Sequence, residues 1–410
     1  MRPIPPGAEH RDEIVNDRAH APRPDDDPHW LLVGGGLQNC LIALLLLDGR
    51  PDARLTVVER NDRLAGNHTW SFLETDVPAD CARALEPAIH RRWDRYDVRF
   101  PGRVRTVETG YRTILSDELH DLLAERIEQA PHARLVLDAD VHEVGPGRAV
   151  LDDGTVLSAT TVIDARGGPA PSGAGGPIEC SGFQKFVGLE LQLAESGPWA
   201  HPIVMDACVP QIDGYRFFYV LPFSPTRVLV EETRFSDTPE LDHDSMRAAV
   251  LAYAQENDLV ITDVVRTESG VLPMPYTMRR SWPTGRPLVA GYAGGFLHPA
   301  TGYSVPVATR LARMVVDSYP NGPTNGEWDT FVGRHRRQYR YAAFLNRLLF
   351  TAYPPPDRAH IFEWFYRLPS PLIERFYRME LTPADMARIF AGRPPRGFSP
   401  KFLRARTAKA

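Results

Sequence analysis

The chain has 410 residues, 43% of them hydrophobic and 24% charged, which is enough to bury a large core and suggests two or three domains. Its four cysteines lie far apart, with no CxxC pair and no Cys/His cluster at the spacing of metal ligands. This pattern excludes a disulfide-rich secreted domain, favours a reducing cytosol, and predicts neither a metal site nor a nucleic-acid partner.

The first 29 residues are rich in Pro, Asp, Glu, Arg and His. They contain no apolar segment of the kind that a signal peptide needs. Such a composition cannot bury enough apolar surface to fold by itself. We therefore expect residues 1–29 to be a disordered extension.

The first apolar run, Trp30 to Leu47, is uncharged and approaches the roughly 20 residues that a membrane-spanning helix needs. Three consecutive glycines, Gly34 to Gly36, interrupt it, and a second strand is predicted from Arg54 to Val58. The run is therefore predicted to be a buried strand, a glycine turn and a buried helix rather than a membrane span.

The same unit has the mechanical parts of a dinucleotide-binding site in the right order. Gly34 allows the tight turn, Gly36 lets the backbone approach a pyrophosphate, and the amides that open the helix complement its charge. Glu59 ends the second strand, 23 positions after Gly36, where it would bind the ribose hydroxyls of an adenosine. Asn39 replaces the third glycine of the usual fingerprint.

Further along the chain, the sequence pattern changes from helix and strand units to short runs typical of β-strands. Short β-like runs from Phe183 to Phe235 predict an antiparallel sheet in a second domain. Around them we expect a strand and glycine turn at Thr160 to Gly168, a helix at Ser245 to Gln255, a strand near Gly270 to Met274, a second glycine turn in "PLVAGYAGGFLHPATGY", and a helix at Ser304 to Val316.

The segment from Phe331 to Ala410 is predicted to be helical and holds 16 Lys or Arg residues against 5 Asp or Glu residues, on an otherwise acidic chain. Thr382 and Pro383 suit the N-cap and first turn of one helix. In "RHRRQYRYAAFLNRLLF", aromatic and aliphatic residues recur at helical spacing beside arginines. Two interpretations stay open: a helix at the surface of an anionic membrane, or a core-facing helix with a solvated basic face.

Six strings then resemble, in order, the bacterial lycopene β-cyclases, from about Trp30 to about Pro395. They are "LLVGGGLQNCLIA", "GNHTWSF", "GFQKFVGLE", "DGYRFFYVLPFSPTRVLVEETRFSD", "AGGFLHPATGYSVP" and "FYRLPSPLIERFY". The resemblance implies a mixed α/β fold like that of aromatic hydroxylases, with an FAD-binding Rossmann-like domain and an antiparallel-sheet substrate domain. It also implies FAD, lycopene or another linear carotenoid as substrate, and a peripheral place on the cytoplasmic face of the membrane.

These patterns together divide the chain into five parts. Residues 1–29 form the extension, 30–180 and 281–330 the FAD-binding domain, 181–280 the substrate domain, and 331–410 a basic, aromatic helical region with possible membrane contact. We expect the FAD to be non-covalent and active when reduced, with NAD(P)H as the reductant. The predicted cofactor residues are Gly34, Gly36, Asn39, Glu59, His68, Asp164, Gly167, Gly291, Gly295, Thr301, Gly302 and Tyr303.

Closing a β-ring on lycopene requires a proton for the terminal double bond and the later loss of a proton from C6. An alkene is a very weak base, so the reaction needs a carboxyl that an apolar pocket keeps neutral, or a group nearby that stabilises the cation, a role that reduced, anionic FAD could fill. The motif "VLVEET" matches the paired glutamates of the family, and alternation along a strand puts Glu231 and Glu232 on opposite faces. We assign Glu231 as the donor by this match, keep Glu232 as the alternative, and name Asp206 as a candidate helper.

Other functions fit parts of the same pattern. A flavin monooxygenase or a prenyl reductase would use the same nucleotide fold, and a carotenoid-binding flavoprotein would need no acid. His68 and His298 could contact flavin or substrate, or could be structural. The aromatic residues of "DGYRFFYV" could stabilise a cation or simply form core. The oligomeric state and the number of ends cyclised stay open.

Overall fold

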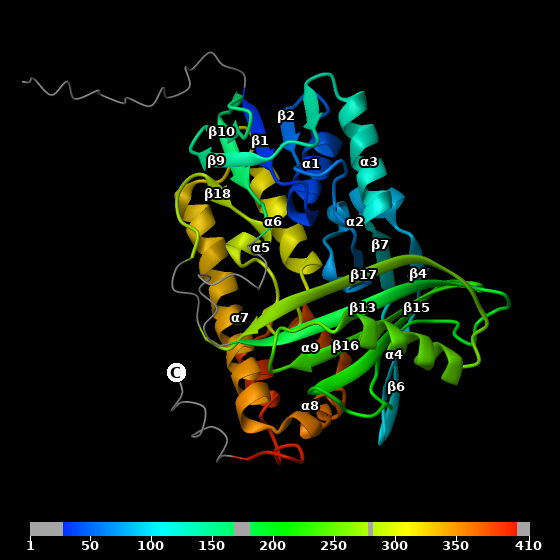
Figure 1. The fold of residues 1–410 in the computed structure, drawn as a ribbon. Helices are drawn as coiled ribbons and strands as arrows, with labels where there is room; N and C mark the ends of the chain where they lie inside the picture. Colours follow the sequence, from blue (N-terminus) through cyan, green and yellow to red (C-terminus); the bar gives the residue numbers. More distant parts are fainter. Residues whose placement is uncertain (1–27, 168–180, 278–281, 400–410) are drawn as a thin grey trace, which may run out of the picture.

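The structure is a computed structural model that describes residues 28–167, 181–277 and 282–399. A parallel sheet lies at one end of the molecule and a larger sheet at the other, and the C-terminal helices run along one side of both (Figure 1). Nearly all of the predicted N-terminal extension lies outside the described residues, as do Cys180 and residues 400–410 of the basic region.

Five strands form the parallel sheet, in the order β18-β12-β1-β2-β8. The first strand of the chain is therefore central: the chain crosses from it through α1 to β2 on one side, and β12 is added later on its other side, as in nucleotide-binding α/β folds. The strands are β1 (His29–Val33), β2 (Arg54–Val58), β8 (Ala133–Val136), β12 (Thr161–Asp164) and β18 (Leu288–Val289).

Helix α1 (Leu37–Gly49) begins directly after the glycine turn, as predicted. It is buried nearly all round because α2 (Ala79–Leu85), α3 (Ser116–Gln129) and α6 (Val305–Asp317) pack against it. This packing explains why the run from Trp30 to Leu47 carries no charge. In the part of the chain that the structure describes, no helix is long and apolar enough to cross a membrane.

A small antiparallel sheet covers the other face of the parallel sheet. It consists of β9 (Val141–Gly145), β10 (Arg148–Leu151) and β11 (Val156–Ser158). Its Ala149 and Leu151 pack against side chains from β1, β2 and β12. The parallel sheet is therefore covered on both faces, which is the usual condition for parallel strands.

Seven strands form the larger sheet, in the order β17-β13-β16-β15-β14-β5-β6. All neighbours are antiparallel except β14 and β5. The antiparallel sheet predicted between Phe183 and Phe235 is thus confirmed. The strands are β5 (Tyr96–Phe100), β6 (Arg103–Val107), β13 (Ser181–Leu193), β14 (Ile203–Asp206), β15 (Tyr215–Ser224), β16 (Arg227–Ser236) and β17 (Ile261–Pro275).

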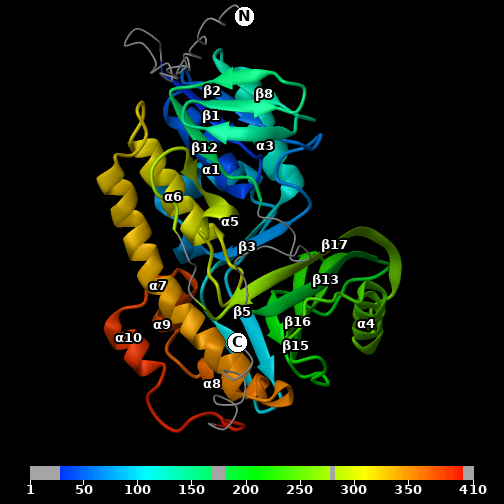
Figure 2. The same ribbon diagram turned by 60° about the vertical axis from the view of Figure 1, so that its left-hand side comes forward.

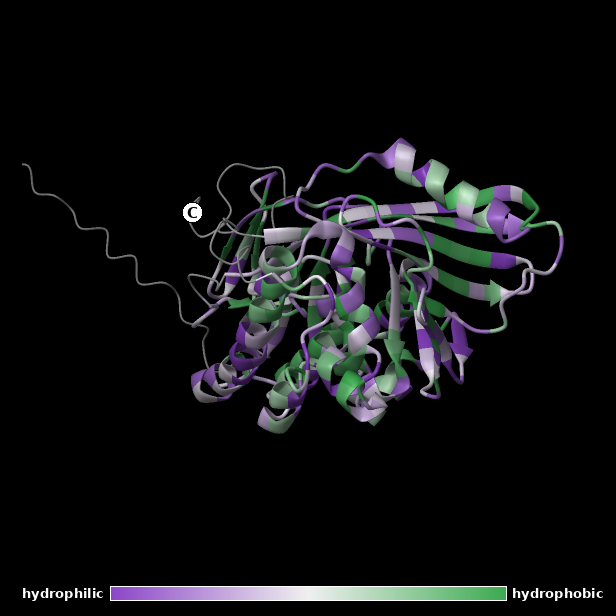
Figure 3. Ribbon diagram, turned by 90° about the horizontal axis from the view of Figure 1, so that it is seen from below, coloured by the Kyte–Doolittle hydropathy of each residue, from purple (hydrophilic) through white to green (hydrophobic). Residues whose placement is uncertain are grey.

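The two faces of the seven-stranded sheet have different neighbours. Helix α4 (His243–Glu256) covers one face, where its Val250, Tyr253 and Ala254 pack on an apolar cluster. Figure 3 shows the strands beneath α4 as largely hydrophobic, whereas α4 itself carries many hydrophilic residues. The other face is turned toward the parallel sheet and the C-terminal helices (Figure 2).

A third antiparallel sheet joins the two halves, in the order β3-β7-β4. Its strands are β3 (Thr69–Leu73), β4 (Arg91–Trp93) and β7 (Tyr111–Leu115). Because β3 starts next to the glycine turns and β7 contributes Tyr111 to the core of the larger sheet, this sheet forms one wall between them. Short 3-10 turns lie at Glu74–Asp76, Glu86–Ala88 and Pro355–Asp357.

The predicted C-terminal helices are present, and Thr382 caps the last of them by accepting a hydrogen bond from the Asp385 amide, as expected. The short helix α5 (Gly291–Gly294) precedes α6 in the second glycine turn. The other helices of this region are α7 (Asn325–Ala352), α8 (Ala359–Phe365), α9 (Ser370–Tyr377) and α10 (Pro383–Arg388).

The structure differs from the predicted division of the chain in two places. Strands β5 and β6 were placed with the FAD-binding part, but they complete the seven-stranded sheet because β5 pairs with β14. The predicted boundary at residue 331 falls inside α7, which starts at the capping box of Thr324 and Glu327. The pairing of β5 with β14 leaves no local signal because it is tertiary, whereas the Thr-x-x-Glu capping box at Thr324 is a local signal for the start of α7 that the predicted division did not use.

Candidate active site

A cavity of about 1340 Å³ lies between the two larger sheets and the C-terminal helices. One end is lined by the glycine turn after β1, the middle by the inner face of the seven-stranded sheet, and the other end by α7, α8 and residues 389–398. The cavity therefore joins the predicted nucleotide site and the predicted acid in one continuous space.

The glycine turn leaves room in front of α1. Gly34 has φ +92°, and a methyl group on it would lie 2.9 Å from the Arg166 amide nitrogen, so this turn requires glycine. A methyl group on Gly36 would meet nothing within 4 Å, and no side chain caps the helix that follows. Open space before uncapped helix amides is what a pyrophosphate needs.

Glu59 and Asn39 brace this turn. Glu59 Oε2 accepts a hydrogen bond of 2.6 Å from the Gly35 amide, and its Oε1 accepts from Asn61. Oε2 keeps capacity for a second donor such as a ribose hydroxyl, whereas Oε1 already accepts from both the amide and the side-chain nitrogen of Asn61. Asn39 is fully buried and donates to the carbonyls of Val33 and Gly34. It therefore supports the turn from behind and does not line the cavity.

The ends of β12 and the loops near α5 and α6 complete this part of the cavity. Asp164 lines it and forms an ion pair of 2.8 Å with Arg166. Gly295 does not line it, since its carbonyl accepts a hydrogen bond from His335 Nε2 behind the loop. The other predicted cofactor residues of this region that line the cavity are Gly167, Gly291, Thr301, Gly302 and Tyr303.

The two histidines occupy different surroundings. His68 lines the cavity, and burial lowers its pKa, so the neutral ring is favoured. His298 is 1% exposed, does not line the cavity, and accepts a hydrogen bond from the Ala300 amide through Nδ1. His298 therefore has the structural role that the sequence left open, and it holds the loop before α6.

Glu231 lies on the inner face of the seven-stranded sheet, together with Leu229 and Thr233 as strand alternation predicts. Its Oε1 accepts a hydrogen bond of 2.6 Å from Thr233 Oγ1. Burial raises the pKa of Glu231 to about 8, and the charge of Glu268 adds to the effect. A carboxyl in this state keeps its proton at neutral pH.

Glu232 and Asp206 lie elsewhere. Glu232 is fully buried on the opposite face, where its Oε1 lies 2.5 Å from Arg216 Nε and 2.8 Å from Arg234 Nε. Asp206 accepts a hydrogen bond of 2.8 Å from Tyr253 of α4. Neither lines the cavity, so the structure does not place Asp206 or Glu232 where it could help Glu231. Asp206 was predicted to help Glu231 only because its strand was expected to lie in the same sheet. That position does not determine which face of the sheet the Asp206 side chain occupies.

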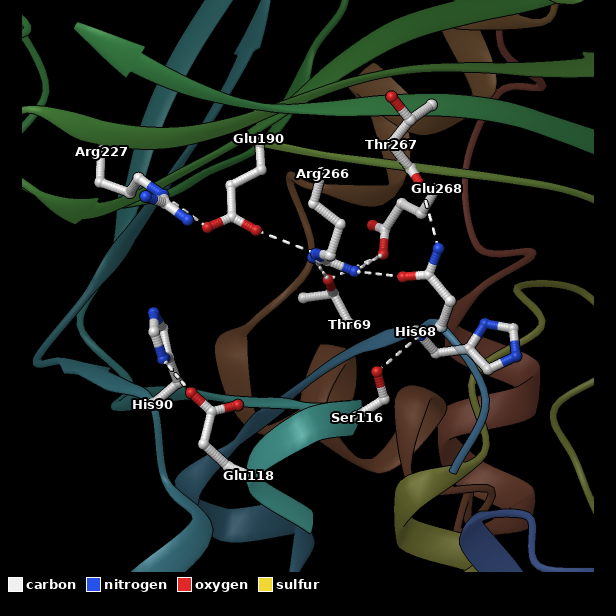
Figure 4. A network of polar contacts seen from close by, with 11 residues as sticks. His68, Thr69, His90, Ser116, Glu118, Glu190, Arg227, Arg266, Thr267 and Glu268 are labelled. Atoms are coloured by element: carbon white, nitrogen blue, oxygen red, sulfur yellow. Dashed lines mark hydrogen bonds and ion pairs between the residues drawn. The ribbon is translucent and has the colours of Figure 1, made fainter. Parts of the chain in front are cut away.

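The sequence analysis did not identify Glu268. It lines the cavity from β17 and belongs to the polar network drawn in Figure 4, where Glu268 Oε2 lies 2.9 Å from both Arg266 Nη1 and Thr69 Oγ1. A charged residue amid the polar run "VVRTESG" resembles a solvated edge strand. Only the pairing of β17 with β13 reveals that its side chain faces the cavity.

Aromatic side chains make up much of the cavity wall beyond Glu231. Phe217, Tyr219 and Phe235 line it from the sheet. Phe218 points to the other face, where it stacks on Tyr253 with ring centroids 4.1 Å apart. The C-terminal helices add the aromatic residues Phe362, Trp364, Phe365, Tyr366, Phe376 and Tyr377.

Comparison with known proteins agrees with this geometry. The model of the family described as "Lycopene cyclase protein" matches residues 30–402. The lycopene beta-cyclase of Pantoea ananas is 37% identical over 375 residues, which is 90% of this chain and 96% of that protein. The lycopene beta-cyclase of a Paracoccus species is also 37% identical, over 89% of this chain and 94% of that protein.

Solved structures show the same fold at low identity. A geranylgeranyl bacteriochlorophyll reductase-like protein from Thermoplasma acidophilum has a TM-score of 0.57 at 11% identity, over 93% of this chain and 99% of that chain. PqsL of Pseudomonas aeruginosa, a probable FAD-dependent monooxygenase, has a TM-score of 0.50 at 16% identity, over 78% of this chain and 99% of that chain. The family match over most of the sequence and the 37% identity to bacterial relatives show that this chain belongs to the lycopene cyclase family.

Proposed function

We propose that this protein is a lycopene β-cyclase, which converts the linear ends of lycopene and similar carotenoids to β-rings, giving γ-carotene and then β-carotene. The observation that carries the proposal is the position of Glu231. This carboxyl lies in an aromatic cavity beside the predicted nucleotide site, and burial and the charge of Glu268 raise its pKa to about 8.

In this proposal, Glu231 donates its proton to the terminal double bond and leaves a tertiary cation. The neighbouring double bond attacks that cation and closes the ring. The proton of C6 then leaves to a base, for which the ionised Glu231 carboxylate is the group in the cavity that would regain its acid form. Atoms are neither gained nor lost, so the reaction is an isomerisation. Phe217, Tyr219 and Phe235 line the cavity on the same sheet as Glu231, and their rings would stabilise the positive charge.

FAD fits the other end of the cavity. The space before Gly36, the uncapped amides of α1 and the Glu59 carboxylate suit a pyrophosphate and an adenosine ribose. His68, Asp164, Gly167 and the second glycine turn would complete the site. Reduced, anionic FAD would supply negative charge near the cation without changing its own redox state, and NAD(P)H would supply the reducing equivalents beforehand.

The decisive experiment is incubation with lycopene under anaerobic conditions with dithionite in place of NAD(P)H. We expect β-ring products, formed without consumption of reductant per ring, because substrate and product are isomers. Chromatography of the carotenoids and titration of the remaining dithionite measure both quantities. Consumption of dithionite in proportion to the rings formed would instead indicate a reductase. In parallel incubations, oxygen uptake with NADPH in air would indicate a monooxygenase, and full activity with oxidised FAD would indicate a different cyclase mechanism.

We also propose that the protein binds peripherally to the cytoplasmic face of the membrane, with the C-terminal end of the cavity toward the lipid. Phe344, Phe390 and Phe398 line this end and are 47%, 48% and 40% exposed. Arg340 and Arg347 are exposed on the same side of α7 as Phe344. Exposed aromatic residues beside cations favour an anionic lipid surface, and an apolar carotenoid could then enter the cavity without crossing water.

A further inference from the structure

Two carboxylates lie side by side on the inner face of the seven-stranded sheet. Glu231 of β16 and Glu268 of β17 are both paired with Gly188 of the intervening strand β13. A methyl group on Gly188 would lie 3.1 Å from Glu268 Cγ and 3.4 Å from Glu231 Cβ. Because Gly188 has no side chain, nothing from β13 separates the two acids. The side chain of any larger residue at this position would lie between them.

The two acids have different partners. Glu268 Oε2 accepts from Arg266 Nη1 and from Thr69 Oγ1, and Arg266 Nε also lies 2.9 Å from Glu190 Oε2 (Figure 4). Glu190 in turn forms an ion pair of 2.7 Å with Arg227. Among the described residues, no ion pair reaches Glu231, whose hydrogen-bond donor is the neutral Thr233 hydroxyl. The arrangement favours a charged Glu268 and a neutral Glu231.

The ionisable groups around the pair come from several elements. Arg266 lies on the same strand as Glu268, Glu190 on β13 and Arg227 on β16. His68 contributes from the residue before β3, and burial favours its neutral form. The hydroxyls of Tyr219 and Tyr111 are hydrogen-bonded to each other, and burial raises the pKa of both. The Glu268 carboxylate is therefore the negative group that bears most directly on Glu231.

We propose that Glu268 is a positioning residue for the cyclisation: its carboxylate, anchored by Arg266 and Thr69, keeps the proton on Glu231 until the substrate takes it. The inference rests on the proposed function, because it assumes that Glu231 is the proton donor. Two carboxylates this close cannot both ionise without a large electrostatic cost, so the anchored one stays ionised and the other stays protonated. The pKa of about 8 for Glu231 agrees with this division.

The test is the pH dependence of kcat/KM for lycopene, measured with reduced FAD in wild type and in Glu268→Gln. A donor must be protonated, so wild-type activity should be present below the folded pKa and fall as the pH rises through about 8. This fall in activity at high pH is the alkaline limb of the pH profile. Removing the negative charge of Glu268 should move the alkaline limb about one pH unit lower. Activity on the acid side of the limb should stay near wild type.

Two variants serve as controls. Glu268→Asp keeps the charge and should keep the limb closer to wild type than Glu268→Gln does. Glu118→Gln removes a carboxylate that pairs with His90, away from the cavity lining, and should leave the limb unchanged. A structural role for Glu268 would lower the whole profile without moving it. An unmoved limb in Glu268→Gln therefore overturns the inference.

Arg266→Gln tests the same electrostatics with the opposite sign. Arg266 lowers the pKa of Glu231, so its removal should move the alkaline limb to higher pH. If Glu268→Gln loses its FAD and fails to fold, Glu268→Asp carries the test of Glu268: moving the carboxylate by one methylene changes its distance from Glu231 and should shift the limb, and an unmoved limb overturns the inference. If the wild-type protein cyclises lycopene but the alkaline limbs of the variants do not move, the inference about Glu268 is wrong and the proposed function stands. Wild type that forms no β-rings contradicts the proposed function itself.

Discussion

Glu231 and Glu232 are neighbours in sequence, yet the fold gives them unrelated environments. Glu231 faces an aromatic cavity, whereas Glu232 is held between Arg216 and Arg234 on the other face of the sheet. Strand alternation predicted this separation correctly from the sequence alone. The partner Glu268 could not be predicted in the same way, because its position depends on how two distant strands pair across Gly188.

At the residue scale, we predict that Glu231→Gln loses cyclisation by roughly 10²- to 10⁴-fold, the range typical of a lost general acid. The amide keeps the shape and most hydrogen bonds, so FAD content and fold should be unchanged. The rate of β-ring formation with reduced FAD measures the effect. Activity near that of wild type would remove Glu231 from the mechanism.

Glu232→Gln is the matched comparison, since the same chemical change is made one residue further along the strand. It weakens a buried ion pair and should reduce thermal stability, because Arg216 and Arg234 lose a charged partner. Turnover per folded, FAD-containing molecule should stay close to wild type. Abolished turnover with flavin still bound would instead make Glu232 the donor.

At the scale of elements, the β1-turn-α1 unit was largely predictable, and the reason is local. The glycines, the apolar strand and helix and the acid at the end of β2 all lie within one continuous segment. Asn39 was assigned to the cofactor by its fingerprint position, but the structure uses it to hold the carbonyls of Val33 and Gly34. The pairing of β5 with β14 joins distant segments, so no local pattern predicts it.

For this unit we predict that Gly36→Val abolishes FAD binding while the protein stays folded. The valine side chain would enter the open space before α1 that we assign to the pyrophosphate. No protein atom lies within 4 Å of a methyl group at this position, so the fold has room for it. Absorbance of the purified protein near the flavin bands measures occupancy, and circular dichroism checks the fold. A replacement at Gly49, where a methyl group also meets no atom within 4 Å, should leave occupancy unchanged. Full occupancy in Gly36→Val would contradict our placement of the cofactor.

At the scale of the whole molecule, the structure confirms that the basic C-terminal segment contains a core-facing helix, while the contact of its exposed side with a membrane stays a proposal. One side of α7 packs into the core through Trp328, Val332 and Tyr339. The other side exposes Arg340, Phe344 and Arg347. The helix is therefore both a structural support and the rim of the cavity.

We predict that replacing Phe344, Phe390 and Phe398 together by Ser weakens binding to vesicles that contain phosphatidylglycerol by about tenfold or more, because exposed aromatic area no longer enters the lipid. Co-sedimentation with the vesicles measures the binding, and uncharged phosphatidylcholine vesicles test the part played by the arginines. Val156→Ser, at an exposed residue of β11 outside the cavity lining, should bind as wild type does. Equal binding by the triple variant would place the lipid contact elsewhere.

The path of the chain between the sheets also determines how the molecule can be divided. It leaves the parallel sheet after β2, supplies β5 and β6 to the seven-stranded sheet, returns for β8 and β12, crosses again for β13 to β17, and comes back for β18. A fragment cut near residue 180 would have β5 without β14 and β12 without β18. Neither half can therefore be expressed as a contiguous autonomous piece, and the long-range pairing should make folding slow and cooperative across both halves.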